Sequence, residues 1–394
     1  MQLELDPNEE GFRAEIRAFL AERLPLDMAA RNLRCFHTTE DDRRTWTGIL
    51  AEKGWAGPAW PKAHGGPGWT NRQVMIFEEE CYLAGAPLVD QGGFKLLAPV
   101  VWTFGAEDQK ARFLEPTRRG EMMWGQGFSE PNAGSDLAAL STRAVRDGDD
   151  YVITGHKIWT SDAQYADQIF ALVKTDPSAK QRGISFIIFA ADAPGVTIRP
   201  IEDIGAGHVL NEIFLDEVRT PTCNLIGEEN KGWTYAKFLL DHERAFAAEV
   251  PRNKMSFERL IKLARLERAG ATPLIEAPEF ALRLAQLETD LAALEFLTLR
   301  ALSQKDTGTP LPVGSILKIR GSELAQRITE MQVEALGEYG VIVYPEGAAM
   351  GEHPPGPEHA PGVLSDFLYR RSVTIYGGSN EIQRTIIAKS FLGL

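Results

Sequence analysis

The spacing of apolar residues changes twice along the chain, and it begins with a helical pattern. Four apolar residues recur at i, i+4, i+7 and i+8, the single stripe of an amphipathic helix: Phe12, Ile16, Phe19 and Leu20. Pro7 stands just before them as a helix start signal, and a second helix is predicted over residues 72–83. We therefore expect an N-terminal α-helical domain over residues 1–120.

A two-residue period replaces the helical one in the middle of the chain. Asp147-Gly148 is a hairpin signal, and the run that follows it over 151–159 has the composition of a strand. Further runs rich in β-branched and aromatic residues are separated by Pro and Gly: 169–173, 184–189, 196–201 and 213–218. This pattern predicts a small all-β middle domain over residues 121–232, built as a sandwich or an open barrel.

Helical spacing returns over residues 233–394, where we expect a C-terminal helical bundle. A long apolar face is predicted from Leu282, Ala285, Leu287, Leu291, Leu294, Leu297 and Leu299, and the segment 316–336 repeats the pattern. Pro251 is expected to kink the first helix of this part. A segment over 344–362 is too rich in Pro and Gly for regular structure, and a lid, a partner contact and disorder stay open for it. The fold class is thus α+β with three domains.

Charge and composition exclude several classes of protein. The net charge of −13 disfavours nucleic-acid binding, which needs clustered Lys and Arg. No apolar stretch approaches the roughly 20 residues that cross a bilayer, and no secretory signal opens the sequence. The three cysteines have no CxxC spacing, so no metal site is expected. We expect a cytoplasmic protein that contacts neither nucleic acid nor membrane.

Three ordered segments carry a resemblance to a known family. They read GFSEPNAGSD over 127–136, ITGHKIWTS over 153–161 and YGGSNEIQR over 376–384. Together they resemble the acyl-CoA dehydrogenase family, and the likeness covers nearly the whole chain. The resemblance implies an FAD-dependent enzyme that desaturates acyl-CoA thioesters, passes electrons to an electron-transfer flavoprotein and forms an oligomer, typically a tetramer.

The catalytic base is where this chain departs from many family members. They place a glutamate after the tyrosine matched by Tyr376, but here that position is Gly377. The resemblance to isovaleryl-type and long-chain-type members assigns the base to Glu243 instead. A glutamate in a site emptied of water is a better proton acceptor because burial disfavours its charged form. The alternative is a helix-surface glutamate that pairs with Arg244 or Lys237.

The same resemblance assigns the binding residues. Those implied for the flavin are Phe128 and Ser129 at the pyrimidine edge, Trp159, Thr160 and Ser161 on the flanking strand, Ser379, Asn380 and Glu381 at a helix start, and Glu334 and Gly337 toward a neighbouring subunit. A helix N-terminus offers unpaired N–H groups to a diphosphate. Those implied for the acyl-CoA are Ser135, Asp241, Arg244 and Gly378.

The half of the FAD site that reaches a neighbouring subunit differs from the family pattern. The segment after Arg268 lacks the usual Phe-Gly, and Glu334 and Glu338 stand where a glutamine and a glycine-rich turn are expected. Acidic groups repel an anionic diphosphate. This pattern resembles one subunit of hetero-oligomeric members that act on steroid side chains or dicarboxylic acyl-CoAs. A catalytically silent partner subunit and a flavin-dependent acyl-CoA oxidase remain alternatives to the dehydrogenase.

Overall fold

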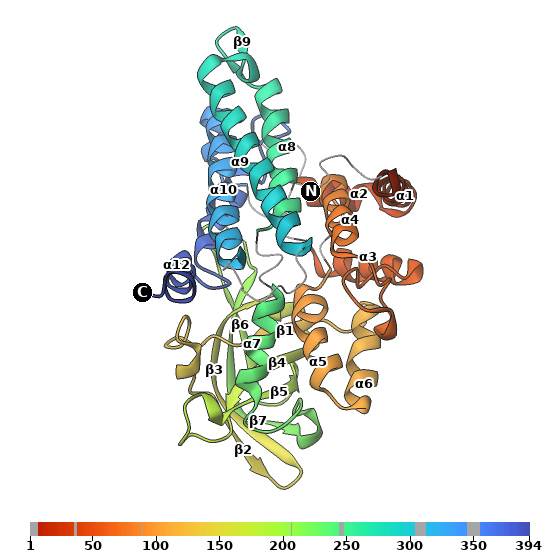
Figure 1. Ribbon diagram of the computed structural model, residues 1–394, viewed down its shortest axis with the longest axis vertical. Helices are drawn as coiled ribbons and strands as arrows, with labels where there is room; N and C mark the ends of the chain where they lie inside the picture. The colour runs from red at the N-terminus through yellow and green to blue at the C-terminus, as the bar shows by residue number, and fades with distance from the viewer. Residues whose placement is uncertain are drawn as a thin grey trace.

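The computed structural model describes residues 7–34, 38–87, 89–205, 207–243, 248–303, 313–344 and 355–394. A curled β-sheet forms one end of the molecule and a bundle of long helices forms the other (Figure 1). The N-terminal helices lie along the side of both parts and join them. Each of the three patterns expected from the sequence is therefore present, in the expected order.

Six α-helices and one π-helical segment build the N-terminal part of the described chain. They are α1 (Pro7–Arg23), α2 (Leu26–Arg34), α3 (Glu40–Lys53), α4 (Asn71–Ala84), the π-helix η2 (Gly92–Leu97), α5 (Ala98–Phe104) and α6 (Glu107–Arg118). Helix α4 begins at a capping box in which Thr70 and Gln73 exchange hydrogen bonds, and it ends at the left-handed Gly85. These end signals explain why the helix predicted over 72–83 is confirmed to within one residue at each end.

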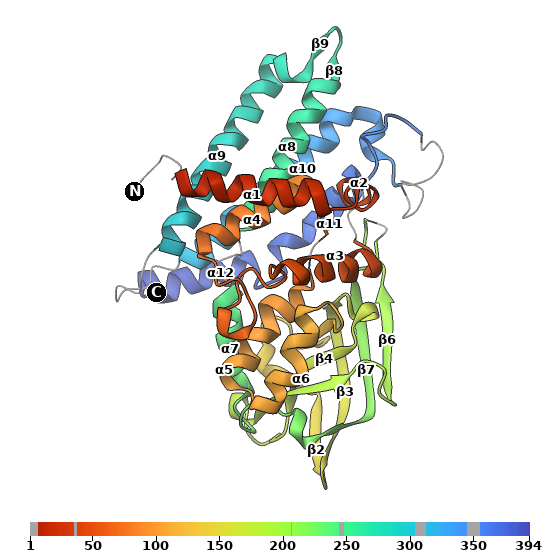
Figure 2. The same ribbon diagram turned by 90° about the vertical axis from the view of Figure 1, so that its right-hand side faces the viewer.

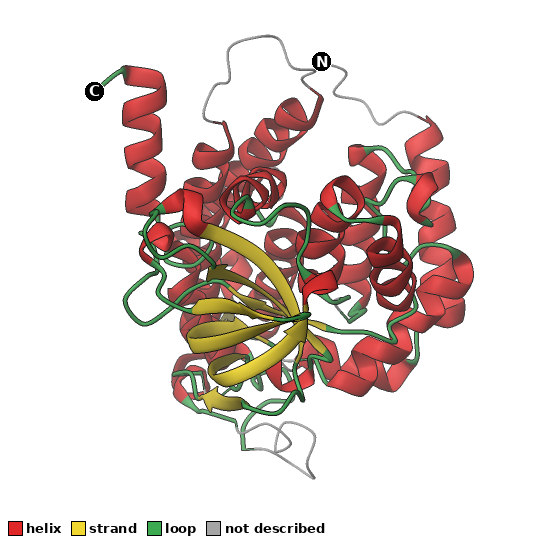
Figure 3. Ribbon diagram, turned by 90° about the horizontal axis from the view of Figure 1, so that it is seen from below, coloured by secondary structure: helices red, strands yellow, loops and turns green. Residues whose placement is uncertain are grey.

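Within the described residues, the middle part of the chain forms a seven-stranded sheet. Its strands are β1 (Trp124–Gly127), β2 (Arg143–Asp147), β3 (Asp150–Ser161), β4 (Gln168–Lys174), β5 (Ile184–Ala190), β6 (Val196–Ile201) and β7 (Leu210–Pro221). The order across the sheet is β1-β4-β2-β3-β7-β6, and β5 pairs with β4. The hairpin expected at Asp147-Gly148 joins β2 to β3. Seen from below, the strands curl around one another without closing (Figure 3).

Helices cover one face of this sheet. Helices α5 and α6 lie against it together with α7 (Gly232–Glu243), which packs on β5, η2 and α5 (Figure 2). One apolar core runs through both parts, from Trp60 and Phe94 of the N-terminal part to Phe170, Phe186 and Leu239. The sheet and the N-terminal helices are therefore joined by a shared hydrophobic core.

The bundle consists of α8 (Val250–Leu266), α9 (Pro278–Ser303) and α10 (Val313–Leu336), and the short hairpin β8 (Arg268–Ala269) and β9 (Thr272–Pro273) closes its far end (Figure 1). Shorter helices follow: η8 (Gly337–Val341), α11 (Val363–Tyr369), η10 (Arg370–Thr374), α12 (Asn380–Ile387) and the π-helical η11 (Ala388–Leu392). The expected kink at Pro251 is wrong. Pro251 lies in the first turn of α8, a position where its missing N–H costs nothing, because α7 and α8 are separate helices.

Leu282 is a second correction. It was expected on the buried face of α9 but is 62% exposed, and Ala285 of the same expected face is exposed as well, whereas Leu287 and Leu294 are buried in the bundle core. Leu282 stands five residues before Leu287, so at 100° per residue it points to another side of the helix. Among the described residues, no helix is long and apolar enough to cross a membrane.

Candidate active site

A bulge in strand β3 presents Trp159 to solvent. The register between β3 and β7 shifts between Lys157 and Thr160, and Trp159 has a φ of 65°, which is rare for a bulky residue. Its indole is 55% exposed. The neighbouring Thr160 is fully buried and its hydroxyl donates to the Gln126 carbonyl at 3.1 Å, whereas Ser161 is exposed. The bulge thus leaves an aromatic face and one hydroxyl available beside each other on the same strand.

A buried ion pair fixes the turn that precedes this strand. The Lys157 ammonium lies 2.8 Å from the Glu130 carboxylate, and both side chains are buried. Lys157 also donates to the carbonyls of Phe128 and Leu172. The Ser129 carbonyl accepts from the Ile158 N–H at 3.0 Å. The main chain at 128–129 is therefore held against β3, and the Phe128 ring is buried between Phe170 and Phe186.

The Glu130 carboxylate accepts further hydrogen bonds from the Ser141 N–H and hydroxyl and from the Thr142 N–H. Burial acts to raise the pKa of this carboxyl, but the Lys157 charge and the hydrogen bonds outweigh it and lower the pKa to about 2. Glu130 is consequently ionised at neutral pH and works as an anchor of the turn. Ser135, farther along the same loop, is exposed.

The second motif forms a turn into helix α12. Gly377 and Gly378 have φ values of 64° and 83°, a conformation that favours glycine. A Cβ on Gly378 would lie 2.6 Å from the Gln383 amide nitrogen, so the end of that side chain would have to shift. The Ser379 hydroxyl accepts from the Ile382 N–H and caps the helix. Asn380 is buried, where its side chain meets Ser322, and Glu381 lies in the first turn.

Tyr376, directly before this turn, joins it to the bundle. Its hydroxyl lies 3.3 Å from a Glu249 oxygen, and the Lys318 ammonium lies over its ring at 4.6 Å from the centroid. Arg370 donates to the other Glu249 oxygen at 2.7 Å. Glu249 itself has a φ of 46° at the start of α8. A non-glycine residue in this region signals local strain, which often accompanies function.

The residue assigned as catalytic base ends helix α7. The structure places Glu243 at the last position of that helix, which packs on the sheet and on η2. The side chains of Asp241 and Glu243 lie outside the described part of the chain, and so does Arg244 as a whole. Their assigned roles therefore stay predictions.

Glu334 and Gly337, the residues assigned to contact the FAD of a neighbouring subunit, lie at the end of α10 and at the start of η8. They are on the bundle and apart from β3. The Glu334 carboxylate forms two hydrogen bonds with the Arg283 guanidinium, at 2.6 and 2.7 Å, on the bundle surface. Gly337 follows at the start of η8 with a φ of 55°, and Glu338 is exposed. The negative charge of Glu334 is thus neutralised within its own chain.

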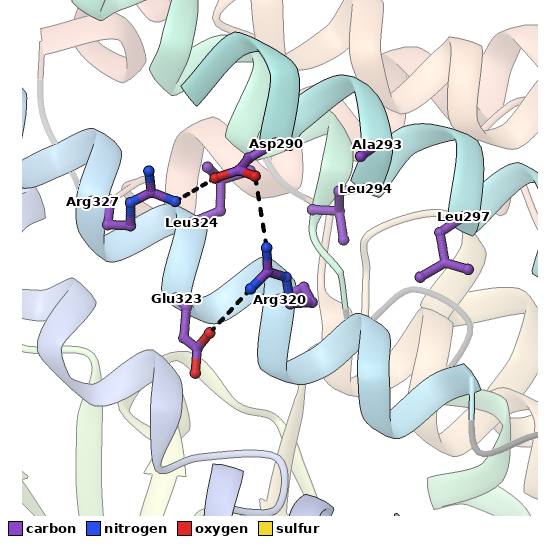
Figure 4. A pocket seen from close by; sticks show the side chains of 8 residues that line it. All are labelled: Asp290, Ala293, Leu294, Leu297, Arg320, Glu323, Leu324 and Arg327. Atoms are coloured by element: carbon purple, nitrogen blue, oxygen red, sulfur yellow. Dashed lines mark hydrogen bonds and ion pairs between the residues drawn. The ribbon is translucent and has the colours of Figure 1, made fainter. Parts of the chain in front are cut away.

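A shallow groove between α9 and α10 lies outside these segments. Its floor is apolar and its rim is an ion-pair network: Asp290, Ala293, Leu294, Leu297, Arg320, Glu323, Leu324 and Arg327 line it (Figure 4). Asp290 meets Arg327 and Arg320, and Arg320 also approaches Glu323. None of the residues assigned from the motifs lines this groove.

The helical part, the curled sheet and the helical bundle correspond in order to three domain models of one family, the acyl-CoA dehydrogenases. Its N-terminal, middle and C-terminal domain models match residues 6–121, 125–218 and 230–392. The chain belongs to the acyl-CoA dehydrogenase family.

Two relatives and two solved structures are similar to the chain over nearly its whole length. Over 395 residues the chain is 35% identical to the acyl-CoA dehydrogenase IpdE1 of Mycobacterium tuberculosis, covering 98% of this chain and 97% of that protein. It is 32% identical to FadE26 of the same organism over 411 residues, 100% of this chain and 99% of the other. Two solved structures each superpose with a TM-score of 0.86 at 31% identity, over 100% of this chain and 99% of the other: the ChsE4-ChsE5 complex of M. tuberculosis and the Tcur3481-Tcur3483 steroid acyl-CoA dehydrogenase.

Sequence reasoning missed the group around Tyr376. Glu249 and Arg370 are 121 residues apart, and no motif connects them. Arg370 within the helical segment 363–374 was the available signal, because an arginine that is buried usually needs an acidic partner. Lys157 and Glu130 lie within the motif segments, and a lysine inside an otherwise apolar strand pattern was the corresponding sign.

Proposed function

We propose that the protein is an FAD-dependent acyl-CoA dehydrogenase that introduces a double bond between the α- and β-carbons of an acyl-CoA thioester. The single observation that carries the proposal is Trp159, a strained and exposed indole at the position that flanks the flavin in the family. A protein that used this tryptophan only for packing would gain nothing by exposing it in an unfavourable backbone conformation.

The residues assigned to FAD suit that cofactor. The Trp159 face and the Ser161 hydroxyl lie on one strand, where an aromatic ring and a hydrogen-bonding partner are both needed for an isoalloxazine. Phe128 contributes through its main chain, because its ring is buried, and Ser129 lies beside it. The turn at Gly377-Gly378 and the start of α12 at Ser379, Asn380 and Glu381 would meet the diphosphate. FAD, when bound, supplies the acceptor for the hydride that leaves the β-carbon.

The chain itself supplies the base and the binding of the thioester. Glu243 takes the α-proton onto its carboxylate, while the electron pair of that C–H bond forms the new double bond and the β-hydride departs. Ser135, Asp241, Arg244 and Gly378 are assigned to the CoA moiety. Gly377 carries no side chain where other members place their base, and we propose that this suits a bulky or branched acyl group.

The assembly that we propose contains a second, paralogous subunit. The ChsE4-ChsE5 complex and the Tcur3481-Tcur3483 steroid acyl-CoA dehydrogenase each carry the names of two proteins. Glu334 and Glu338 are acidic groups at the positions that would face a neighbour's FAD, and only Glu334 is offset by Arg283, so we propose a paralogue as that neighbour. We further propose an electron-transfer flavoprotein as the electron acceptor, and the cytoplasm as the compartment.

Anaerobic mixing of the flavin-loaded protein with CoA thioesters tests the activity. We expect the flavin absorbance to bleach with a suitable thioester, and Glu243→Gln to bind flavin yet fail to bleach it. Full activity in Glu243→Gln would refute the assignment of the base. A stable but colourless protein, purified alone and with its paralogue, would favour the silent-subunit alternative. Peroxide release without an added acceptor would favour the oxidase.

A further inference from the structure

Strand β7 carries one amide in an otherwise apolar row of buried side chains. Residues 211, 213 and 215 alternate onto the same face of the strand, and Asn211, Ile213 and Leu215 are 0%, 0% and 3% exposed. Burial of an amide is unfavourable unless its polar atoms have hydrogen-bond partners, so an aliphatic residue would be the simpler choice at position 211. Nothing in the mechanism proposed above uses this asparagine.

The Asn211 amide has partners for both its nitrogen and its oxygen. Its Nδ2 donates to the Thr160 carbonyl at 3.1 Å and to the side-chain oxygen of Gln164, in the short helix η4 (Ala163–Tyr165), at 2.6 Å. Because a main-chain carbonyl can only accept, Nδ2 must face Thr160, and Oδ1 must face the His208 Nε2, which lies 2.9 Å away. His208 therefore carries a proton on Nε2 and donates it to Asn211.

Gln164 closes these contacts into a ring of hydrogen bonds. Its side-chain nitrogen donates to the His208 carbonyl at 3.0 Å, while its oxygen accepts from Asn211. We call Asn211, Gln164, His208 and the Thr160 carbonyl the Asn211 network. A buried polar network whose members are satisfied fixes one arrangement of the main chain around it.

The Asn211 network lies at one end of the bulge in β3. Asn211 is the register partner of Thr160, the residue that directly follows Trp159, and the next pair is Lys157 with Ile213. The step from 157 to 160 on β3 thus faces the step from 211 to 213 on β7, so β3 holds one extra residue. Such a bulge keeps its shape where the pairing on each side of it is fixed, because a slip by one residue would turn the side chains to the other face.

Other contacts hold β3 before and after this point. The buried ion pair of Lys157 holds the strand before the bulge, and the Asp162 N–H donates to the Val209 carbonyl at 2.7 Å after it. Between these contacts, the Asn211 amide holds the main chain of Thr160. The two exposed residues on either side of Thr160, which are those assigned to the flavin ring, therefore take their direction from a main chain that Asn211 holds.

We propose that Asn211 is a positioning residue for the flavin: it keeps the bulge of β3 in the register in which Trp159 and Ser161 face the isoalloxazine ring. The inference rests on the proposed function, since it concerns the cofactor of that same site. Asn211 acts through the main chain of Thr160, and it lies outside the motif segments 127–136, 153–161 and 376–384. A leucine at position 211 would fill the same apolar row but would leave the Thr160 carbonyl without this donor.

Two substitutions test the hydrogen bonds of Asn211 apart from its packing. Asn211→Asp keeps the shape but replaces the donor with a carboxylate that can only accept, and Asn211→Leu removes all polar atoms. FAD titration of the flavin-stripped protein, in complex with its paralogue where loading requires it, measures the effect. In both variants we expect the dissociation constant of FAD to rise about tenfold, the factor that corresponds to the loss of one hydrogen bond.

A second measurement follows Trp159 without any flavin. Fluorine NMR on protein labelled with fluorotryptophan resolves the indoles, and Trp159→Phe identifies the resonance of Trp159. We expect both Asn211 variants to shift or broaden this resonance, while the resonances of the buried Trp46 and Trp60 stay in place. A general loss of stability would move the buried indoles as well.

The matched control is a buried asparagine in the bundle. The Asn253 Nδ2 also donates to two main-chain carbonyls, those of Ala248 and Gly321, at 3.1 and 3.3 Å. Asn253→Asp should leave both the FAD affinity and the Trp159 resonance as in the wild type. Equal effects of the substitutions at 211 and 253 would overturn the inference, because they would show that any buried asparagine matters in the same way.

The remaining outcomes separate this inference from the proposed function. Wild-type FAD affinity and an unmoved Trp159 resonance in both Asn211 variants overturn the positioning role and leave the dehydrogenase standing. Gln164→Met removes one partner at a half-buried position, so it answers the question if the Asn211 variants do not fold: it should weaken FAD binding several-fold, and unchanged binding overturns the inference. A wild-type protein that binds no FAD, alone or with its paralogue, sinks both proposals. FAD binding without bleaching by any thioester refutes the activity and leaves the role of Asn211 standing.

Discussion

The Lys157 ammonium and the Glu130 carboxylate form a buried ion pair at 2.8 Å that ties two of the family motifs together. One partner comes from the turn after β1 and the other from the strand that bears Trp159. Because the same lysine binds the Phe128 carbonyl, the pair sets the spacing between the main chain at 128–129 and β3. The position of the flavin's pyrimidine edge in the proposed enzyme therefore depends on a pair that would not itself contact the flavin.

Removal of the lysine alone should be costly. Lys157→Met leaves the Glu130 charge buried without its cation, and we expect the free energy of unfolding to fall by about 3–5 kcal/mol. Urea unfolding followed by circular dichroism measures this change. The double variant Lys157→Met with Glu130→Gln removes both charges and should regain part of the loss. A single variant as stable as the wild type would show that the pair does not anchor the turn.

Acid should weaken the protein through Glu130. The folded pKa is lowered to about 2, below the unfolded value near 4.5, so the carboxylate contributes stability that is fully present above pH 4.5 and is lost as the pH falls toward 2. The shift corresponds to about 3 kcal/mol. Urea midpoints measured between pH 5 and pH 3 should fall less steeply in Glu130→Gln than in the wild type. Parallel pH profiles would contradict the assignment.

The strained conformation of Trp159 should lower the stability of the flavin-free protein, while its indole should raise the affinity for FAD. Trp159→Gly relieves a left-handed conformation that costs roughly 1–2 kcal/mol, against about 0.5–1 kcal/mol of added chain entropy. We expect the flavin-free protein to be at least as stable as the wild type, while its affinity for FAD falls. Trp159→Phe keeps both the strain and an aromatic ring, so it should retain more flavin. Thermal unfolding without FAD and flavin titration measure the two quantities separately, and unchanged FAD affinity in Trp159→Gly would count against the proposal.

A glutamate at position 377 should partly replace the proposed base at position 243. We expect Glu243→Gln to lower kcat by about a hundredfold to ten-thousandfold, the usual worth of a general base. Gly377→Glu added to Glu243→Gln should restore part of the activity, although the left-handed φ of 64° costs about 1 kcal/mol for a glutamate. Gly377→Ala with Glu243→Gln controls for backbone strain alone. Stopped-flow flavin reduction measures each variant, and equal rates in the two double variants would argue against this geometry.

The Arg283–Glu334 pair should matter for assembly more than for the folding of the chain. The pair is half-exposed, so Arg283→Ala should change the free energy of unfolding by no more than about 1 kcal/mol. It would leave the Glu334 charge uncompensated where a neighbouring cofactor is expected, and the flavin content of the complex with the paralogue should fall. Arg283→Ala combined with Glu334→Gln should recover it. Identical flavin content in all three would separate this pair from the intersubunit site.

Sequence patterns predicted the individual helices and strands of this fold more accurately than the way these elements are connected and packed. Both ends of strand β6 agree with the prediction of 196–201. A short run of β-branched residues bounded by Pro and Gly favours a strand over a helix. The break between α7 and α8 was missed, since Pro251 was expected within one long helix and lies instead in the first turn of the second. One kinked helix and two separate helices are both compatible with the local preferences of this sequence. The packing of α7 on the sheet decides between them.

For the site, motif spacing assigned Trp159 and Ser161 to the flavin but gave no sign of their conformation. A positive φ at a tryptophan contradicts local preference, and only the surrounding register shift in β3 holds it there. The Glu249–Arg370 pair depends on a contact between helices that are far apart in sequence, which periodicity does not encode. The side chain of Glu243 lies outside the described residues, so its role still depends on the resemblance.

Helix α7 packs on the sheet, whereas Glu249 and Arg252 begin α8 of the bundle. The proposed base thus belongs to the sheet side of the molecule, and the ion-paired groups beside Tyr376 belong to the bundle side. An acyl group that extends from the proposed base toward Tyr376 would therefore contact both. Substitutions deep in the bundle, remote from any reacting atom, would then tune which acyl lengths are turned over.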